Sequence, residues 1–282
     1  MEKFTEQMAR QIIKPRPSIS HKGDFGRVLI IAGDEHFGGA AIMSATAAVY
    51  AGAGLVTVAT VRDNWQPLHA RLPEAMVTDW DAATLTPLLH GADVVVIGPG
   101  LGTSSAAQQV LTLCLQEIAA TQTLIIDGSA IDIIAQNKQL PAKGNIIWTP
   151  HQMEWQRLSG IAIAEQTLTT TASANQRIGG TLVLKGNPTR IYNADAGYEN
   201  TTGGPAMATG GSGDTLTGVI AAICAQFGNS TKAIATAVWL HSAAADEIAK
   251  SSYVALPTQV VQVLPQLLNR LAAATAAHTI GF

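Results

Sequence analysis

The sequence predicts an α/β protein in which helices cover both faces of a central, mostly parallel sheet. Short runs rich in Val and Ile alternate with longer segments of helical character, which is the pattern of βαβ units. The runs are apolar on both faces, as in strands that lie under helices on each side. Because 47% of the 282 residues are hydrophobic and only 13% are charged, we expect a folded chain with a large core.

The strands are expected at the apolar runs 28–32, 56–59, 94–97, 124–126, 146–148 and 182–184. Helices are expected at 40–51, 106–119, 168–178 and 215–227. Beyond residue 218 the alanine-rich segments 233–250 and 257–277 are expected to form helices that cover the sheet. The segment up to about residue 23 and the tail 278–282 are expected to be loosely ordered or used in subunit contacts. With no repeat and no break in composition, we expect a single domain over residues 1–282.

Charge and cysteine content exclude several classes of protein. The net charge of −3 provides no positive field for holding a nucleic acid. Cys114 and Cys224 lie far apart in apolar stretches, which is not a disulfide framework or a zinc site. No apolar run is long enough for a membrane span or a signal peptide. A cytoplasmic protein that binds neither membrane nor nucleic acid is therefore expected.

Polar and glycine residues follow most of the predicted strands. They occur in Gly98-Pro99-Gly100-Leu101-Gly102, Asp127-Gly128, Thr149-Pro150-His151 and Lys185-Gly186-Asn187. In open α/β sheets, ligands bind at the carboxyl ends of the strands. The sequence therefore predicts a binding site at this edge.

The glycine-rich segment before the helix at 215–227 is the strongest sign of chemistry. Gly210, Gly211, Ser212 and Gly213 precede Asp214, and their backbone N–H groups, together with the positive end of the helix, could hold an anion or a phosphate. We call these four residues the anion hole. The plainer alternative is a glycine turn in which Asp214 caps the helix.

Asp214 is the predicted catalytic base. We expect the helix terminus to stabilise its anion and keep its pKa low, so that it is ionised at neutral pH. An ionised carboxylate beside a phosphate site can accept the proton of an attacking hydroxyl, as in kinases. The pattern favours phosphoryl transfer, and the chain contains no Gly-x-x-x-x-Gly-Lys-Ser/Thr loop.

Three further residues allow two interpretations each. Lys185 could approach a phosphate, or it could be a solvated lysine beside a hairpin turn. His151 could contact substrate, or it could cap the helix that follows. Asp127 could hold a metal-bound water, or it could cap residues 129–134. The histidines show no metal-ligand spacing, so no metal-ligating residue is predicted.

Several motifs together resemble one family. They are His21-Lys22-Gly23-Asp24-Phe25-Gly26, Gly38-Gly39-Ala40-Ala41, Gly52-Ala53-Gly54, Gly98-Pro99-Gly100-Leu101-Gly102, Thr149-Pro150-His151, Lys185-Gly186-Asn187 and Gly210-Gly211-Ser212-Gly213-Asp214. In this order they resemble the ADP/ATP-dependent NAD(P)H-hydrate dehydratases, which are ribokinase-like proteins that repair hydrated nicotinamide dinucleotides. The resemblance extends from about residue 21 to 270.

The resemblance implies a role for particular residues. Those expected to contact the adenine nucleotide are Lys185, Gly186, Asn187, Pro188, Thr189 and Gly213. Those expected to lie against the hydrated dinucleotide are Ala41, Gly102, His151 and Asp214, with Ala40 as a close second to Ala41. Two departures stand out. Asp127-Gly128-Ser129 stands where the family often has Asp-Ala-Asp, so a role for a second carboxylate is left open, and Gly203-Gly204 stands where it usually has Gly-Asn.

The activity implied is dehydration of the S epimer of NADHX and NADPHX, with ADP as phosphoryl donor and AMP and phosphate as products. ATP is the alternative donor, and Mg²⁺ is expected to screen the phosphates. The resemblance also implies a homotetramer and, because no fused epimerase domain is expected, a separate NAD(P)HX epimerase.

Two other functions remain open at this stage. One is a ribokinase-like kinase that phosphorylates a hydroxymethylpyrimidine or a thiazole alcohol. The other is a nucleotide-binding regulatory protein without turnover.

Overall fold

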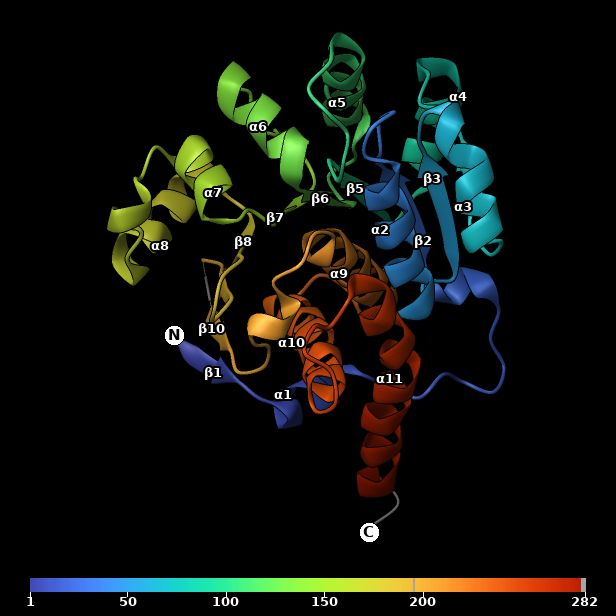
Figure 1. The fold of residues 1–282 in the computed structure, drawn as a ribbon, viewed down its shortest axis with the longest axis vertical. Coiled ribbons are helices and arrows are strands. Elements are labelled where there is room, and N and C mark those ends of the chain that lie inside the picture. The colour runs from blue at the N-terminus through green and yellow to red at the C-terminus, as the bar shows by residue number, and fades with distance from the viewer. Residues whose placement is uncertain (195, 280–282) are drawn as a thin grey trace.

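The computed structural model describes residues 1–194 and 196–279, and their strands form a ten-stranded sheet in the order β1-β10-β9-β8-β7-β6-β5-β2-β3-β4 (Figure 1). The strands are β1 (Glu2–Phe4), β2 (Arg27–Ile31), β3 (Leu55–Ala59), β4 (Met76–Thr78), β5 (Val94–Ile97), β6 (Thr123–Ile126), β7 (Asn145–Trp148), β8 (Thr181–Leu184), β9 (Arg190–Tyr192) and β10 (Gly197–Asn200).

The seven strands from β8 to β4 in this order are parallel, as the sequence predicts. β9 runs antiparallel to both β8 and β10, and the chain start, β1, pairs in parallel with β10 at the far edge. The four strands that the sequence did not predict, β1, β4, β9 and β10, have only three or four residues each. These strands lack the continuous run of apolar residues by which the other strands were predicted.

Helices cover both faces of the sheet, which confirms the predicted fold class. They are α1 (Glu6–Ile12), α2 (Gly38–Tyr50), α3 (Trp65–Arg71), α4 (Ala82–Gly91), α5 (Ser105–Glu117), α6 (Gly128–Asn137), α7 (Gln152–Ser159), α8 (Leu168–Ile178), α9 (Ser212–Phe227), α10 (Thr231–Ala249) and α11 (Pro257–Thr279). Helices α4 to α8 pack on one face, and α1, α2, α9, α10 and α11 pack on the other (Figure 1).

Alternate residues of the central strands enter two separate cores. In β2, Val28 and Ile30 pack towards α2 and α9, whereas Leu29 and Ile31 pack towards α4 and α5. Because successive side chains of a strand point to opposite faces, a strand buried on both sides must be apolar throughout. This explains the continuous Val and Ile runs in the sequence.

Helices α2 and α9 approach one another at backbone distance. A Cβ on Gly218 would collide with the carbonyl oxygen of Ser44, so only glycine fits there. One residue earlier in α9, the hydroxyl of Thr217 lies 3.0 Å from that of Ser44. The contact fixes the start of α9 relative to the start of α2 at the carboxyl edge of the sheet.

The start of the chain is part of the fold, and the expectation of a loosely ordered segment was wrong for its first part. The Phe4 ring is fully buried and meets the Tyr198 ring edge-on at 5.4 Å. Ala9 and Ile13 are buried in the same core. Ala9 and Ile13 are spaced by four residues, so both face the core from one side of the helix, and this burial explains why the segment is ordered. Of the tail, residues 280–282 lie outside the described residues. No helix in the described ranges is both long and apolar enough to span a bilayer.

Candidate active site

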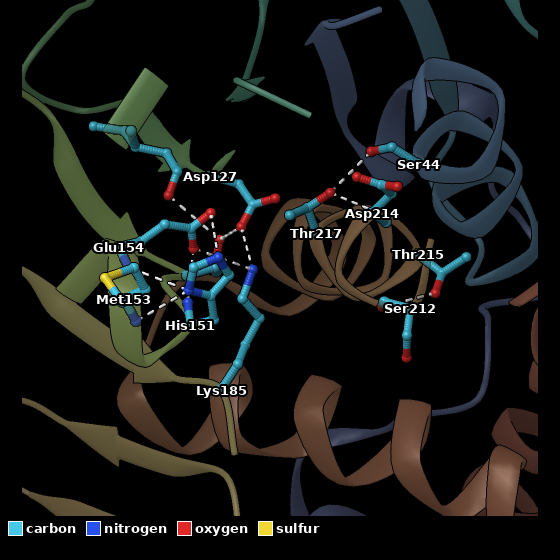
Figure 2. Close-up of polar contacts among 12 residues, drawn as sticks. Ser44, Asp127, His151, Met153, Glu154, Lys185, Ser212, Asp214, Thr215 and Thr217 are labelled. Carbon is cyan, nitrogen blue, oxygen red and sulfur yellow. Dashed lines mark hydrogen bonds and ion pairs between the residues drawn. The ribbon is translucent and has the colours of Figure 1, made fainter. Parts of the chain in front are cut away.

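Residues from three neighbouring strand ends and one helix start meet at the carboxyl edge of the sheet. Asp127 follows β6, Thr149 follows β7, and Lys185 follows β8. Asp214 lies in the first turn of α9 (Figure 2). The strand order brings these four positions together although they are up to 87 residues apart in sequence (214 − 127). The predicted binding edge is therefore a cluster of polar side chains.

Lys185 forms the centre of this cluster. Its Nζ donates to Asp127 Oδ1 at 2.8 Å and lies 3.8 Å from Glu154 Oε2. Asp127 is 3% exposed, and the same Oδ1 accepts the Thr149 hydroxyl at 2.7 Å. Figure 2 shows Asp127, Glu154 and Lys185 facing one another. Lys185 is therefore not a solvated lysine beside a hairpin turn, because it is paired with two carboxylates.

The charges in the cluster act on one another. Burial disfavours the charged ammonium of Lys185, but the negative charges of Asp127 and Glu154 outweigh burial and raise its pKa above the ordinary value. Burial raises the pKa of Glu154, and the charge of Lys185 offsets only part of this. Lys185 is consequently a fixed positive charge at neutral pH.

Asp214 behaves differently from the prediction. Burial, and next the negative charge of Asp127, raise its pKa to about 6, although Lys185 and the helix start favour the anion. Within the described residues no group donates a hydrogen bond to this carboxylate, so the usual cause of a low carboxylate pKa is missing. The expectation of a low pKa was wrong, but the carboxylate is still mostly ionised at pH 7. A base with a pKa close to neutrality is better suited to accept a proton.

The anion hole lies directly before Asp214. Gly211 is the N-cap of α9 with φ 92°, a conformation that favours glycine, and a Cβ there would collide with the sulfur of Met43. The first backbone N–H of α9 that donates within the helix is that of Thr215, which bonds to the carbonyl oxygen of Gly211 at 3.0 Å. The N–H groups of Gly213 and Asp214 precede it at the positive end of the helix. A Cβ on Gly213 would come within 3.2 Å of Lys185 Nζ, so the lysine and the helix start face the same space.

A cavity of about 350 Å³ opens beside Lys185 and the start of α9. Five of the residues predicted to contact the nucleotide line it, together with Ser212: they are Lys185, Gly186, Asn187, Thr189 and Gly213. Pro188, which follows Asn187 through a cis peptide bond, is not part of the lining, and neither are Gly210 and Gly211.

Sequence analysis missed one wall of this cavity. Val238, His241 and Ser242 of α10 line it, as do residues of the segment 202–208. His241 and Ser242 stand in an alanine-rich helix, where the only available signal was a pair of polar residues within an apolar run. No motif or periodicity marked them as part of a site.

The residues predicted to lie against the dinucleotide come from several elements: Ala40 and Ala41 from the first turn of α2, Gly102 from the segment after β5, His151 from the start of α7 and Asp214 from the start of α9. Gly102 donates its N–H to the Ser129 hydroxyl at 3.2 Å. Ala40 is 9% exposed, whereas the side chain of Ala41 is fully buried. Ser129 therefore fixes the backbone at Gly102.

His151 caps α7, as one of its two interpretations stated. Its Nδ1 accepts the N–H groups of Met153 and Glu154 at 3.1 and 3.2 Å, and Nε2 lies 3.3 Å from Glu154 Oε1.

Asp127 precedes α6 without a side-chain capping bond, because its carboxylate is held by Thr149 and Lys185. Over the described ranges, no three His, Cys, Asp or Glu side chains gather in a way that would hold a metal ion.

Comparison with known proteins identifies the family. The family model described as NAD(P)H-hydrate dehydratase matches residues 28–266. An ADP-dependent (S)-NAD(P)H-hydrate dehydratase of Lactiplantibacillus plantarum is 53% identical over 268 residues, covering 94% of this chain and 96% of that protein.

Two solved structures are similar throughout. A ribokinase-like superfamily protein from Enterococcus faecalis has a TM-score of 0.94 at 45% identity and covers 96% of each chain. An ADP/ATP-dependent NAD(P)H-hydrate dehydratase from Bacillus subtilis, co-crystallised with ATP and Mg²⁺, has a TM-score of 0.87 at 29% identity over 96% of this chain and 98% of that one. With its ribokinase-like fold and these relatives, the chain belongs to the NAD(P)H-hydrate dehydratase family.

Proposed function

We propose that the protein catalyses the ADP-dependent dehydration of (S)-NADHX and (S)-NADPHX to NADH and NADPH, with AMP and phosphate as products. The observation that carries the proposal is Asp214, whose carboxylate accepts no hydrogen bond within the described residues and lies beside the mostly buried Lys185 and the first N–H groups of α9. The relative from Lactiplantibacillus plantarum, by its name, performs the same reaction.

The first step is phosphoryl transfer. Asp214 accepts the proton of the hydroxyl on C6 of the hydrated nicotinamide ring, and the hydroxyl oxygen attacks the β-phosphorus of ADP. The bond from the β-phosphorus to the bridging oxygen breaks, and AMP leaves. Lys185 and the N–H groups at the start of α9 stabilise the charge on the transferred group.

The second step is elimination. The lone pair of the ring nitrogen expels phosphate from C6, and C5 loses a proton to the departing phosphate, which restores the dihydronicotinamide. Hydroxide is a poor leaving group and phosphate a good one, so phosphorylation makes the loss of water feasible. This explains why a dehydratase has a site suited to phosphoryl transfer.

Asp127 and Glu154 fit a role in holding Mg²⁺. Mg²⁺ is usually bound through one or two carboxylates together with substrate phosphates, and these two carboxylates lie beside Lys185, which lines the cavity. The ion would neutralise phosphate charge. The Bacillus subtilis relative was co-crystallised with ATP and Mg²⁺, which supports the use of this ion together with the nucleotide.

The assay that tests the proposal uses the full chain with (S)-NADHX, Mg²⁺ and either ADP or ATP. We expect dihydronicotinamide absorbance to recover, with one AMP and one phosphate formed per NADH when ADP is present, and we expect chelation of Mg²⁺ to stop the reaction. Formation of a stable phosphorylated thiazole or pyrimidine alcohol, without recovery of NADH, would instead support a small-molecule kinase. No turnover with either nucleotide would support a regulatory protein.

We also propose a cytoplasmic homotetramer with one ribokinase-like domain over residues 1–282, supplied with the S epimer by a separate epimerase. The buried, unpaired Cys114 and Cys224 fit a reducing compartment.

The proposed epimerase is supported by an Escherichia coli relative that is named as a bifunctional NAD(P)H-hydrate repair enzyme. This chain matches 52% of the length of that relative, which supports the coupling of two activities. Light scattering tests the tetramer, and mixed epimers with and without a purified epimerase test the coupling.

A further inference from the structure

One wall of the cavity beside Lys185 carries a histidine that the proposed chemistry does not use. His241 of α10 lines the cavity, yet the residue is only 3% exposed. Its Nε2 lies 2.8 Å from the hydroxyl of Thr215, the residue after Asp214 in α9. Burial lowers the pKa of His241 to about 4, so the ring is neutral at physiological pH. One ring nitrogen therefore carries a proton and the other a lone pair.

The surroundings of Thr215 decide which nitrogen is protonated. The Thr215 hydroxyl lies 3.0 Å from the carbonyl oxygen of Ser212 and 3.3 Å from that of Gly211. Carbonyl oxygens only accept, so the single proton of the hydroxyl is directed to them. The hydroxyl oxygen then accepts from Nε2–H of His241. In this tautomer Nδ1 is an acceptor, and across the described part of the chain no group donates to it.

The cavity is lined by both polar and apolar groups. Lys185 and Gly213 line it together at the start of α9. Met207, Leu216 and Val238 line the cavity together with His241 and provide apolar surface. A ligand that extends from phosphates to a flat, mostly apolar ring system suits this arrangement.

The segment 202–208, which lines part of the cavity, is held to α10 by hydrogen bonds. The N–H of Gly203 donates to Asp246 Oδ2 at 2.8 Å, and the Thr202 hydroxyl donates to the carbonyl oxygen of Trp239 at 3.2 Å. Asn200 Nδ2 donates to the Ser242 hydroxyl at 3.1 Å. The wall that carries His241 is therefore rigid, and a hydrogen bond formed there costs little ordering of the protein.

We propose that Nδ1 of His241 accepts a hydrogen bond from the nucleoside part of ADP, either from the exocyclic amine of the base or from a ribose hydroxyl, and so selects the nucleotide. This inference rests on the proposed function for the identity of the ligand. A buried acceptor left without a donor costs binding free energy, so nucleotides that lack the donor are disfavoured. His241 is thus a specificity residue.

Binding of ADP, with Mg²⁺, to the full chain by titration calorimetry tests the inference without requiring turnover. The probes are ADP, purine riboside 5′-diphosphate, which lacks the amine, and 2′-deoxy-ADP and 3′-deoxy-ADP, which lack one hydroxyl each. We expect one of the three analogues to bind about 3- to 10-fold more weakly than ADP, the effect of one hydrogen bond. The analogue that binds more weakly is the one that lacks the donor group, and it therefore identifies the donor. Equal affinity for all four nucleotides would overturn the inference.

Two substitutions separate recognition of the ligand from support of Thr215. His241→Asn keeps a polar atom near the position of Nδ1, whereas His241→Gln keeps one near the position of Nε2. We expect His241→Gln to bind ADP as weakly as the unchanged protein binds the weakened analogue, and to bind ADP and that analogue with equal affinity. We expect His241→Asn to retain more of the affinity for ADP and more of the preference for ADP over the analogue. If His241→Gln keeps the full discrimination of the unchanged protein, the histidine has only a structural role and the inference fails.

Failure of the proposed function gives a different result. If the unchanged protein binds no adenine nucleotide at all, the nucleotide assignment of the cavity is wrong, whatever the variants do. If it binds ADP and the discrimination does not depend on His241, only the specificity role is wrong. Circular dichroism and the melting temperature of each variant show whether it is folded before its affinity is interpreted.

Discussion

At the scale of single residues, Asp214 combines partial burial, a pKa of about 6 and a carboxylate without a hydrogen-bond donor among the described residues. These properties are typical of a general base and unusual for a helix cap, which would be bonded to backbone N–H groups. The sequence located this residue through the glycines around it. It could not indicate the raised pKa, because burial and the charge of Asp127 arise only when separate strand ends meet.

Asp214→Asn should lower kcat by about 10²- to 10⁴-fold, the usual contribution of a general base, and leave ADP affinity within about threefold. Turnover of (S)-NADHX and calorimetry measure the two effects. Asp132→Asn is the matched control, since Asp132 pairs with Arg157 at the surface. A variant of Asp214 with normal kcat would remove the residue from the mechanism.

The pH dependence of kcat/KM should show an acid limb near pH 6. The base must be ionised to accept a proton, and the pKa of Asp214 lies at about 6, so activity is expected to fall as the pH decreases through this value. A rate profile over pH 5 to 8, at saturating ADP, measures it. An unchanged rate at pH 5 would contradict the assignment.

The same pKa makes a prediction for stability. The raised pKa of about 6 means that the folded chain holds the Asp214 proton more tightly than the unfolded chain does. Ionisation therefore costs stability, and the cost grows as the pH rises from about 4 to 6. Asp214→Asn should melt at a higher temperature than the unchanged protein at pH 8, and this advantage should disappear towards pH 4.

Lys185 stabilises two buried carboxylates as well as serving the proposed chemistry. Lys185→Met would leave Asp127 and Glu154 without their cation, and should lower the free energy of unfolding by about 3 kcal/mol. Lys250→Met, which breaks an exposed pair with Glu247, should change it by less than about 1 kcal/mol. Urea unfolding of both variants measures the difference. Equal effects would mean that the buried cluster is not held by Lys185.

At the scale of elements, the contact between α2 and α9 fixes where the anion hole lies. The sequence predicted both helices from their composition, but it could not indicate that they touch at Gly218 and Ser44, because that contact joins segments 174 residues apart (218 − 44). The same limit applies to α10. Its His241 became part of the cavity wall only through the packing of α10 against α9.

Gly218→Ala should separate α2 from α9 and destabilise the fold by about 1 to 3 kcal/mol, because the added methyl group has no room. We also expect a reduced kcat, since the start of α9 moves relative to Lys185. Gly91→Ala is the matched control: no atom lies within 4 Å of a Cβ there. Urea unfolding and turnover of both variants check this, and equal stability of the two would show that the contact is not tight.

At the scale of the whole molecule, the sheet shows what sequence patterns can and cannot predict. The seven parallel strands form a continuous block, and six of them were predicted from their apolar runs. The antiparallel edge of β9 and β10, and its extension by β1, were not predicted. The half-exposed pattern of β10 and the three residues of β1 are compatible with a loop as much as with a strand.

The pairing of β1 with β10 has a consequence for the order of events in the cell. Glu2 pairs with Tyr198, so β1 waits for a partner that is synthesised almost 200 residues later. At about 5 to 20 residues per second this delay is roughly 10 to 40 s. During that time Phe4 has no aromatic partner and the strand edge is unpaired. Until β10 has been synthesised, this unpaired strand edge is a site at which the chain can aggregate.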